Sequence, residues 1–281
     1  MIPLIEHIVA SLRDAYPEHE LHELAYWVVE ETTGLSRSDI LCGCKGIENI
    51  PHLEIILQKL RQHEPIQYIF SHAQWMGLDL RVTPATLIPR PETAELVEWV
   101  LYMFPSTMED TTGCTRRVRV LDIGTGSGCI ALALQQHRPM WEVSGLDVSP
   151  EALQVARYNG VHNHIDVQWL QADILTEDIG TYDIIVSNPP YVRESEQAQM
   201  EDRVLCYEPH TALFVPDNDP LLFYRRIASM KRATHLFFEI NEALPEKMCA
   251  LLRGCGYVDV QLKHDMYGKP RMLYGRLDRK G

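Results

Sequence analysis

Residues 118–134 of the 281-residue chain read VRVLDIGTGSGCIALAL. The apolar residues up to Ile123 are typical of a buried strand, and the small and apolar residues from Cys129 onward indicate a helix. Between them, glycines at 124, 126 and 128 let the backbone turn tightly and approach a ligand with no Cβ in the way. The spacing is G-x-G-x-G, which differs from the G-x-G-x-x-G of dinucleotide-binding folds. The stretch therefore predicts a strand, a ligand-binding loop and a helix.

Acidic residues close the next two strands that the sequence predicts. Asp147 follows a strand at 142–146, where a carboxylate can accept hydrogen bonds from both hydroxyls of an adenosine ribose. This arrangement leaves NAD and S-adenosyl-L-methionine as candidate cofactors. After the third strand, Asp173 can bond the adenine amino group and Ile174 can flank its ring, although Asp173 as a helix cap or loop carboxylate is the alternative. Asp122 either holds the ammonium group of the methionine moiety or braces the glycine loop.

Residues 187–191 read SNPPY and directly follow another apolar run. Pro189 and Pro190 donate no backbone N–H and have φ fixed near about −65°. The carbonyls of Asn188 and Pro189, with the Asn188 side-chain oxygen, therefore form a rigid corner of hydrogen-bond acceptors, which Tyr191 is placed to cover. Such a corner suits a planar –NH2 group, which offers two N–H donors and a flat surface for stacking. A Pro-Pro turn that only leaves a strand is the alternative interpretation.

The net charge limits the classes of function. The chain has 26 lysine and arginine residues against 39 aspartate and glutamate residues, a formal net charge of −13. Proteins that grip long nucleic acids usually carry a basic stripe, because neutralising phosphates supplies much of their affinity. The sequence shows no such stripe, so we expect no stable nucleic-acid partner.

The expected compartment is cytoplasmic. The start of the chain, MIPLIE, lacks the basic region and long apolar core of a signal peptide, and no run of about 18 apolar residues indicates a membrane span. The seven cysteines are scattered and odd in number, as expected for reduced thiols. Cys42 and Cys44 form no Cys-x-x-Cys pair, and His52 does not complete a usual zinc pattern. We therefore expect no membrane association and no metal.

Hydrophobic periodicity divides the chain into two parts. Residues 1–64 show the three-to-four spacing of helices, and residues 74–82 read as a short hairpin. From residue 118 onward, strands alternate with helices, which predicts a mostly parallel sheet covered by helices on both faces. The strands are expected at 118–123, 142–146, 167–171, 182–187, 236–240, 257–262 and 271–275. We expect a helical domain at 1–73, a hairpin and linker at 74–90, and an α/β domain at 91–281. The polar stretch at 105–117 reads as a loop.

Together these motifs resemble the class I S-adenosylmethionine-dependent methyltransferases that act on planar amide or amine nitrogens. Within that group, the chain is similar to the bacterial glutamine-N5 methyltransferases of peptide-chain release factors, the HemK/PrmC family. The narrower resemblance rests on four segments: EPIQYI at 64–69, TPATLIPRPET at 83–93, YEP at 207–209 before AL at 212–213, and GKPR at 268–271. It covers roughly residues 60–276.

The resemblance implies an α/β, Rossmann-like class I methyltransferase fold with about seven strands, and an N-terminal all-α domain that helps dock the release factor. It implies S-adenosyl-L-methionine as cofactor and S-adenosyl-L-homocysteine as product. The cofactor-binding residues that it implies are Asp122, Gly124, Thr125, Gly126, Ser127, Gly128, Asp147, Asp173, Ile174 and Asn188. The family often has an aromatic residue at the position of Ile174.

The implied reaction transfers a methyl group to the side-chain amide nitrogen of the glutamine in the Gly-Gly-Gln motif of class I release factors, in support of translation termination. The implied catalytic and substrate-binding residues are Asn188, Pro189, Pro190 and Tyr191. An amide nitrogen is a poor nucleophile, so it must be held in line with the methyl group at about 3–3.5 Å. We hypothesise that the Asn188 side-chain oxygen and the Pro189 carbonyl accept its two N–H groups and favour the positive charge that develops. Tyr191 would stack on the amide, and no side chain stands out as a general base.

Other functions remain open at this level. A nucleic-acid adenine-N6 methyltransferase would present the same two N–H groups to the same corner, but it usually needs a basic recognition region. A scaffold built on an inactive methyltransferase fold would show a broken glycine loop or a lost Asn188, and the sequence shows neither. An NAD oxidoreductase would need the other glycine spacing. Arg90 and Glu92 either line the pocket or form an ion pair that joins the domains.

Overall fold

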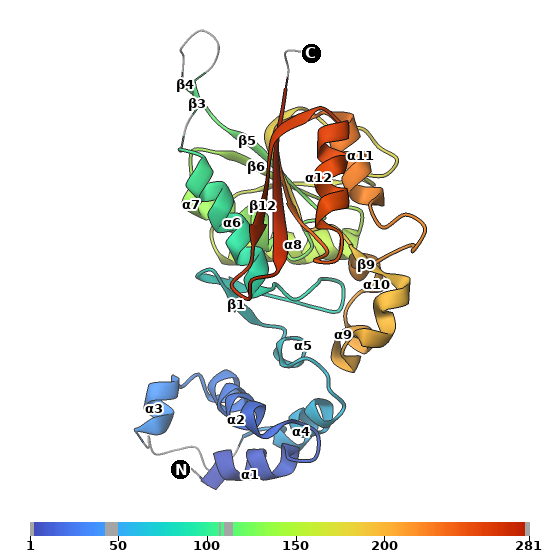
Figure 1. Ribbon diagram of the computed structural model, residues 1–281. Helices are drawn as coiled ribbons and strands as arrows, with labels where there is room; N and C mark the ends of the chain where they lie inside the picture. Colours follow the sequence, from blue (N-terminus) through green and yellow to red (C-terminus); the bar gives the residue numbers. More distant parts are fainter. Residues whose placement is uncertain (1–2, 43–49, 107, 110–114, 279–281) are drawn as a thin grey trace. The chain divides into compact units, whose positions relative to one another are not determined.

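The computed structural model describes residues 3–42, 50–106, 108–109 and 115–278 (Figure 1). The chain forms two compact units. One comprises the residues up to His72 together with Glu201–Tyr207, and the other comprises Ala73–Met200 and the residues from Glu208 onward. In the described part, no helix is long and apolar enough to cross a membrane.

The first unit is helical, as the sequence predicted for residues 1–64. Its helices are α1 (Pro3–Leu12), α2 (Glu18–Thr33), α3 (Arg37–Leu41), α4 (Leu53–Arg61) and α5 (Ile66–Phe70). The stripes of apolar side chains on α1, α2 and α4 meet in one core, which contains Ile8, Leu21 and Leu57. Gly34 ends α2 with φ +69°, a conformation that a glycine adopts without strain. A capping box of Ser36 and Asp39 begins α3.

The second unit is built on a seven-stranded sheet with the order β12-β13-β11-β8-β5-β6-β7. Its strands are β5 (Arg119–Ile123), β6 (Glu142–Asp147), β7 (Gln168–Gln171), β8 (Tyr182–Ser187), β11 (Ala233–Glu239), β12 (Tyr257–His264) and β13 (Pro270–Leu277). All neighbours are parallel except β13, which runs antiparallel to β11 and β12. The prediction of a mostly parallel sheet of about seven strands is confirmed.

Helices cover both faces of this sheet (Figure 1). On one face, α6 (Pro91–Met103) and α7 (Cys129–His137) pack over a core that includes Trp99 and Phe237. On the other face, α11 (Leu222–Met230) and α12 (Pro245–Gly254) pack over a core that includes Tyr224 and Phe238. A further helix, α8 (Pro150–His162), contacts β6 and β7. The strand order turns in opposite directions on the two sides of β5, which creates a crevice at its carboxyl end.

Several short elements complete this part of the fold. The predicted hairpin is present as β1 (Ala73–Trp75) and β2 (Leu78–Leu80). The stretch predicted as a loop at 105–117 carries a small antiparallel pair, β3 (Met108–Glu109) with β4 (Thr115–Arg116), while residues 107 and 110–114 lie outside the described residues. The segment after residue 191 forms elements that the sequence analysis did not predict. These are β9 (Val192–Arg193), the 3-10 helix η1 (Glu194–Gln199), α9 (Asp202–Tyr207), α10 (His210–Leu213) and β10 (Phe214–Val215).

Candidate active site

A pocket with an empty volume of ≈ 1070 Å³, part of it open to solvent, lies at the carboxyl end of β5 in the second unit. This is the crevice at which open α/β sheets bind their ligands. Ten of the residues that the sequence singled out line it: Gly124, Thr125, Gly126, Ser127, Asp147, Asp173, Ile174, Asn188, Pro189 and Pro190. The fold therefore brings the glycine loop, the acids after β6 and β7, and the SNPPY motif to one cavity.

The glycine loop is pinned to the end of β6. The backbone N–H groups of Gly124 and Thr125 donate to the carbonyl of Leu146 over 2.8 and 2.9 Å. The N–H of Gly126 donates to Asp147 Oδ2 over 2.9 Å. Gly126 has φ +54°, and a Cβ built there would meet no atom within 4 Å, so the loop presents bare backbone to open space.

Asp122 lies beneath the loop and outside the pocket lining. Its side chain is fully buried, and Oδ2 accepts a hydrogen bond of 2.6 Å from the Thr125 hydroxyl. Burial raises the pKa of this carboxyl from 3.8 to about 7. Of the two roles that the sequence left open, the geometry supports bracing of the loop, because Asp122 does not border the cavity.

Gly128 was expected to bind the cofactor, but it does not line the pocket either. A Cβ at this position would lie 2.7 Å from Cη2 of Trp169 and 3.2 Å from Cβ of Ala156. Gly145 on β6 is equally tight, since a Cβ there would lie 2.5 Å from Cζ3 of the same indole ring. The third glycine of the loop thus makes room for Trp169 between α8 and the sheet, a packing role.

The residues after β7 combine two functions. Asp173 lines the pocket, and its Oδ1 and Oδ2 accept hydrogen bonds from the Leu175 N–H (2.9 Å) and the Thr176 hydroxyl (3.2 Å). The alternative reading of Asp173 as a loop carboxylate therefore describes its contacts within the protein, and its bond to adenine stays a prediction. Ile174 is buried and contributes an apolar wall.

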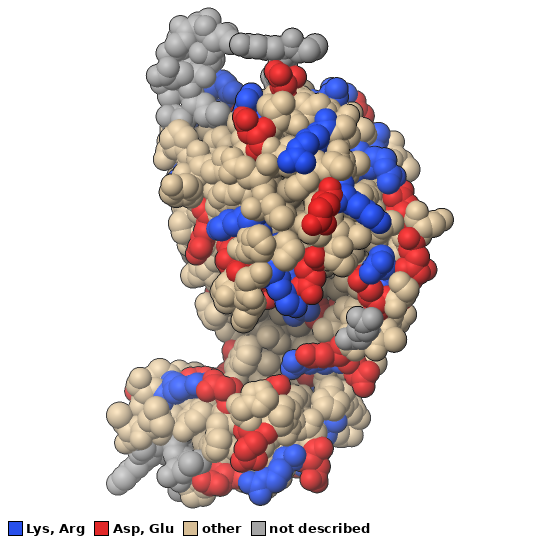
Figure 2. Space-filling model, in the orientation of Figure 1, with Lys and Arg blue, Asp and Glu red and all other residues tan. Residues whose placement is uncertain are grey.

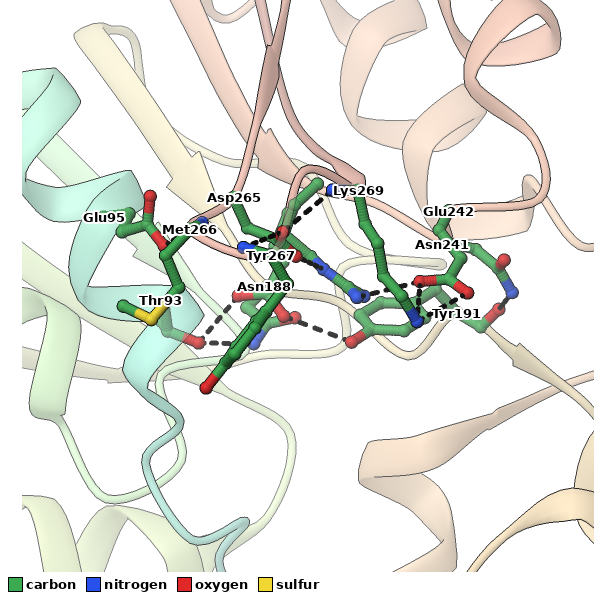
Figure 3. A network of polar contacts seen from close by, with 12 residues as sticks. Thr93, Glu95, Asn188, Tyr191, Asn241, Glu242, Asp265, Met266, Tyr267 and Lys269 are labelled. Atoms are coloured by element: carbon green, nitrogen blue, oxygen red, sulfur yellow. Dashed lines mark hydrogen bonds and ion pairs between the residues drawn. The ribbon is translucent and has the colours of Figure 1, made fainter.

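The SNPPY motif borders the glycine loop at the end of β8. A Cβ built on Gly124 would lie 4.0 Å from the carbonyl oxygen of Asn188. The Asn188 side chain donates through Nδ2 to Oγ1 of Thr93 over 3.2 Å (Figure 3). Tyr191 was expected to cover the corner, yet it does not line the pocket, and its hydroxyl donates to Glu239 Oε1 over 3.1 Å. Burial raises the pKa of Tyr191, so the phenol keeps its proton.

Arg90 lines the pocket but does not pair with Glu92. Its Nη2 donates to Glu208 Oε1 over 2.5 Å, and the Ile88 N–H donates to the other oxygen of Glu208 over 3.4 Å. Both partners of this ion pair belong to the second unit, so the pair does not join the two domains.

Three polar residues of the site, Thr93, Glu208 and Glu239, were not predicted from the sequence. Thr93 and Glu208 belong to segments that carry the family resemblance, and neither these segments nor the sequence around Glu239 predicts a role for the three side chains. The available signal was an acidic residue at the end of a buried apolar run, as in LFFEI, because an acid is seldom fully buried unless it is paired.

Residues 103–210 match the family model described as methyltransferase small domain. A relative named release factor glutamine methyltransferase, from Bacteroides thetaiotaomicron, is 43% identical over 282 residues, which cover 95% of this chain and 96% of the relative. The chain belongs to the release factor glutamine methyltransferase family. A family member of the same name from Flavobacterium psychrophilum is 41% identical and covers 94% of this chain and 95% of the relative.

Solved structures support the fold of this family member. The catalytic domain of hMettl16, in complex with the MAT2A 3'UTR hairpin 6, aligns with a TM-score of 0.55 at 20% identity and covers 73% of this chain and 77% of that one. A methyltransferase from Pyrococcus furiosus aligns with a TM-score of 0.50 at 20% identity, and the alignment covers 71% of this chain and 89% of that one. At this identity the likeness concerns the fold alone, and it confirms the Rossmann-like class I methyltransferase fold.

Proposed function

We propose that this chain transfers the methyl group of S-adenosyl-L-methionine to the side-chain amide nitrogen of the glutamine in the Gly-Gly-Gln motif of class I peptide chain release factors. The observation that carries the proposal is the position of the Asn188–Pro190 corner, which lines the same cavity as the glycine loop. Membership of the release factor glutamine methyltransferase family supports the same substrate.

The cavity fits this cofactor. It lies at the carboxyl ends of the parallel strands, where α/β folds bind their ligands, and open space above Gly126 admits a ligand against the backbone. Asp147 would take the ribose hydroxyls, and Asp173 with Ile174 would take the adenine. When bound there, S-adenosyl-L-methionine supplies a methyl group activated by a positively charged sulfonium.

The protein's own contribution is to hold a weak nucleophile. Since the –NH2 group of Asn188 donates one hydrogen bond to Thr93, the orientation of the amide is fixed, and its side-chain oxygen can accept a hydrogen bond from a substrate. That oxygen and the Pro189 carbonyl would accept the two N–H groups of the glutamine. Fixed acceptors stabilise the positive charge that develops on the nitrogen and need no reorganisation during the reaction. Tyr191, held by its hydroxyl to Glu239, would support the corner from outside the pocket lining.

We further propose that the helical unit, which comprises the residues up to His72 and Glu201–Tyr207, docks the release factor. A segment that follows the SNPPY motif packs within this unit, where the Tyr207 hydroxyl donates to the Gln62 carbonyl over 2.9 Å and Arg203 pairs with Glu20 at 3.4 Å. Next to them lies a hollow lined by Tyr16, His63 and Arg203, among others. An exposed hollow with aromatic and charged groups suits a protein partner.

Adenine-N6 methylation of nucleic acid is not favoured. On the face drawn in Figure 2, lysine and arginine side chains are interspersed with acidic ones over both units. Many of the arginines are paired with carboxylates, for example Arg116 with Asp183 and Arg225 with Asp219. Such surfaces offer little net attraction to a phosphate backbone.

The test is incubation of the purified chain with labelled S-adenosyl-L-methionine, with release factor, DNA and RNA offered side by side. We expect label on the release factor, located by mass spectrometry on the Gly-Gly-Gln glutamine and absent from a release factor with alanine there. Label on nucleic acid, or on another residue of the release factor, would overturn the proposal.

A further inference from the structure

A network of buried polar side chains joins the SNPPY motif to α6 and β11 (Figure 3). Glu239 ends β11 and is 2% exposed, and Thr93 lies in the first turn of α6 and is 3% exposed. The Thr93 hydroxyl donates to Glu239 Oε2 over 2.6 Å, and Asn188 Nδ2 donates to Thr93 Oγ1 over 3.2 Å. Three elements far apart in sequence thus meet in one line of hydrogen bonds that ends at the pocket.

The hydrogen bonds of this network all run in one direction, from donor to acceptor, because each group has a fixed number of hydrogen-bond donors. An ionised carboxylate can only accept hydrogen bonds, so Thr93 must donate its single hydroxyl hydrogen to Glu239. The Thr93 oxygen can then only accept a hydrogen bond from Asn188. The Asn188 amide must therefore turn its –NH2 group, and not its side-chain oxygen, toward Thr93. The side-chain oxygen of Asn188 is therefore left for the cavity that Asn188 lines.

The same carboxylate holds the other polar residue of the motif. Glu239 Oε1 accepts a hydrogen bond from the Tyr191 hydroxyl, so each carboxylate oxygen accepts one hydrogen bond from a hydroxyl group. Burial raises the pKa of Glu239, and the hydroxyls of Thr93 and Tyr191 act against that shift, as does the charge of Arg271, which pairs with Asp265 at 3.1 Å and Glu242 at 3.2 Å. When Glu239 is ionised, two hydroxyl donors and a nearby guanidinium balance its buried charge.

We propose that Thr93 and Glu239 are positioning residues for methyl transfer, which set the side-chain oxygen of Asn188, rather than its –NH2 group, toward the substrate. The inference rests on the proposed role of Asn188 as acceptor. Without the hydrogen bonds from Thr93 and Glu239, the Asn188 side-chain amide can flip. It would then present its two N–H donors to the two N–H donors of the substrate glutamine. That juxtaposition offers no hydrogen bond and repels the positive charge of the transition state.

The test compares Thr93→Val, which keeps the shape but removes the hydroxyl, with Thr93→Ser, which keeps the hydroxyl. Full-length release factor and labelled S-adenosyl-L-methionine give kcat and KM, calorimetry gives the affinity for S-adenosyl-L-homocysteine, and thermal melting checks folding. We expect Thr93→Val to lower kcat by about 10²-fold, as a misaligned reacting group does, with KM and cofactor-product affinity changed by less than about threefold. Thr93→Ser should recover most of the lost kcat.

A role limited to holding α6 on the sheet makes a different prediction. It would lower the melting temperature and weaken S-adenosyl-L-homocysteine binding together with activity, and it would show no selective loss of kcat. That result overturns the inference, as does full activity of Thr93→Val. Inactivity of the unmodified chain on every release factor would instead count against the proposed function itself.

Glu239→Gln provides a second test should Thr93→Val fail to fold. The glutamine side chain is nearly the same shape but has only one acceptor oxygen for two hydroxyl donors. We expect a selective fall in kcat of the same order, about 10²-fold. An unchanged kcat in this variant would show that the ionised carboxylate does not position Asn188.

Discussion

The backbone N–H of Gly126 donates a hydrogen bond to Asp147 Oδ2 over 2.9 Å. The other oxygen of Asp147 accepts from the Ser149 N–H over 3.0 Å. One carboxylate thus ties the glycine loop after β5 to the turn after β6, and it lines the cavity at the same time. Burial raises the pKa of Asp147, and the backbone donors act against that shift.

We predict that Asp147→Ala weakens binding of S-adenosyl-L-homocysteine by about 10- to 100-fold, because hydrogen bonds to a charged group contribute about 1.5–3 kcal/mol. Isothermal titration calorimetry of the purified protein measures this directly. Asp166→Ala, at an exposed position before β7, is the matched control and should leave the affinity unchanged. Equal affinities for both variants would remove Asp147 from the cofactor site.

Gly128→Ala should destabilise the protein without a direct effect on the cofactor. The residue has φ +83°, and its new Cβ would approach Trp169 to 2.7 Å. Backbone strain of about 1–2 kcal/mol adds to overpacking of about 1–3 kcal/mol, so we expect a loss of about 2–5 kcal/mol in unfolding free energy. Urea denaturation tests this, with Gly254→Ala in α12 as control, since a Cβ there meets nothing within 4 Å. Similar stability of the two variants contradicts the packing role.

The buried Asp122 makes stability depend on pH. Its carboxyl has a pKa of 3.8 when unperturbed and of about 7 in the folded protein. The folded state therefore binds the proton of Asp122 more tightly than the unfolded state does. The resulting stabilisation is present at low pH and is lost as the pH rises through the pKa of Asp122 in the folded protein. Asp122→Asn stays neutral, so its stability relative to wild type should rise between about pH 4 and about pH 7, by at most about 4 kcal/mol, and level off above that. Thermal melts of the ligand-free proteins check this, and a difference that stays constant with pH would refute it.

Asn188→Ala should abolish most of the chemistry and spare cofactor binding. The variant loses the acceptor that faces the substrate, and removal of one preorganised group of this kind costs about 10²–10³-fold in kcat. Single-turnover methylation of release factor gives the rate, and calorimetry with S-adenosyl-L-homocysteine gives the affinity, which should change only modestly. Methyl transfer at the wild-type rate would exclude Asn188 from the reaction.

The hydrogen-bond chain behind Asn188 should add a pH dependence to kcat. Burial raises the pKa of Glu239 and nearby Glu92 adds to the shift, while the hydroxyls of Thr93 and Tyr191 and the charge of Arg271 oppose it. As the pH falls through this raised value, Glu239 gains a proton and can donate to Thr93, which reverses the chain. We expect wild-type kcat to fall on the acidic side through this step, and Thr93→Val to lack it. Identical acid limbs in the two pH profiles would contradict the prediction.

Local features of the site were readable from the sequence because they depend on local sterics. The strand, glycine loop and helix at 118–134 follow from apolar runs and from glycines that permit positive φ, as found at Gly124, Gly126 and Gly128. The rigidity of the SNPPY corner follows from the covalent geometry of two prolines. The alternation of strands and helices then indicated a parallel sheet with its ligand site at one edge.

The partners of these residues depended on the tertiary structure alone. Thr93 meets Glu239 across 146 positions and Asn188 across 95, since α6 lies against strands that the sheet order makes neighbours. In the same way, Gly128 leaves room for the side chain of Trp169, which comes from β7, two strands away from β5 in the sheet. Propensity and periodicity act over a few residues, whereas contacts and the direction of hydrogen bonds arise only when distant strands are brought together.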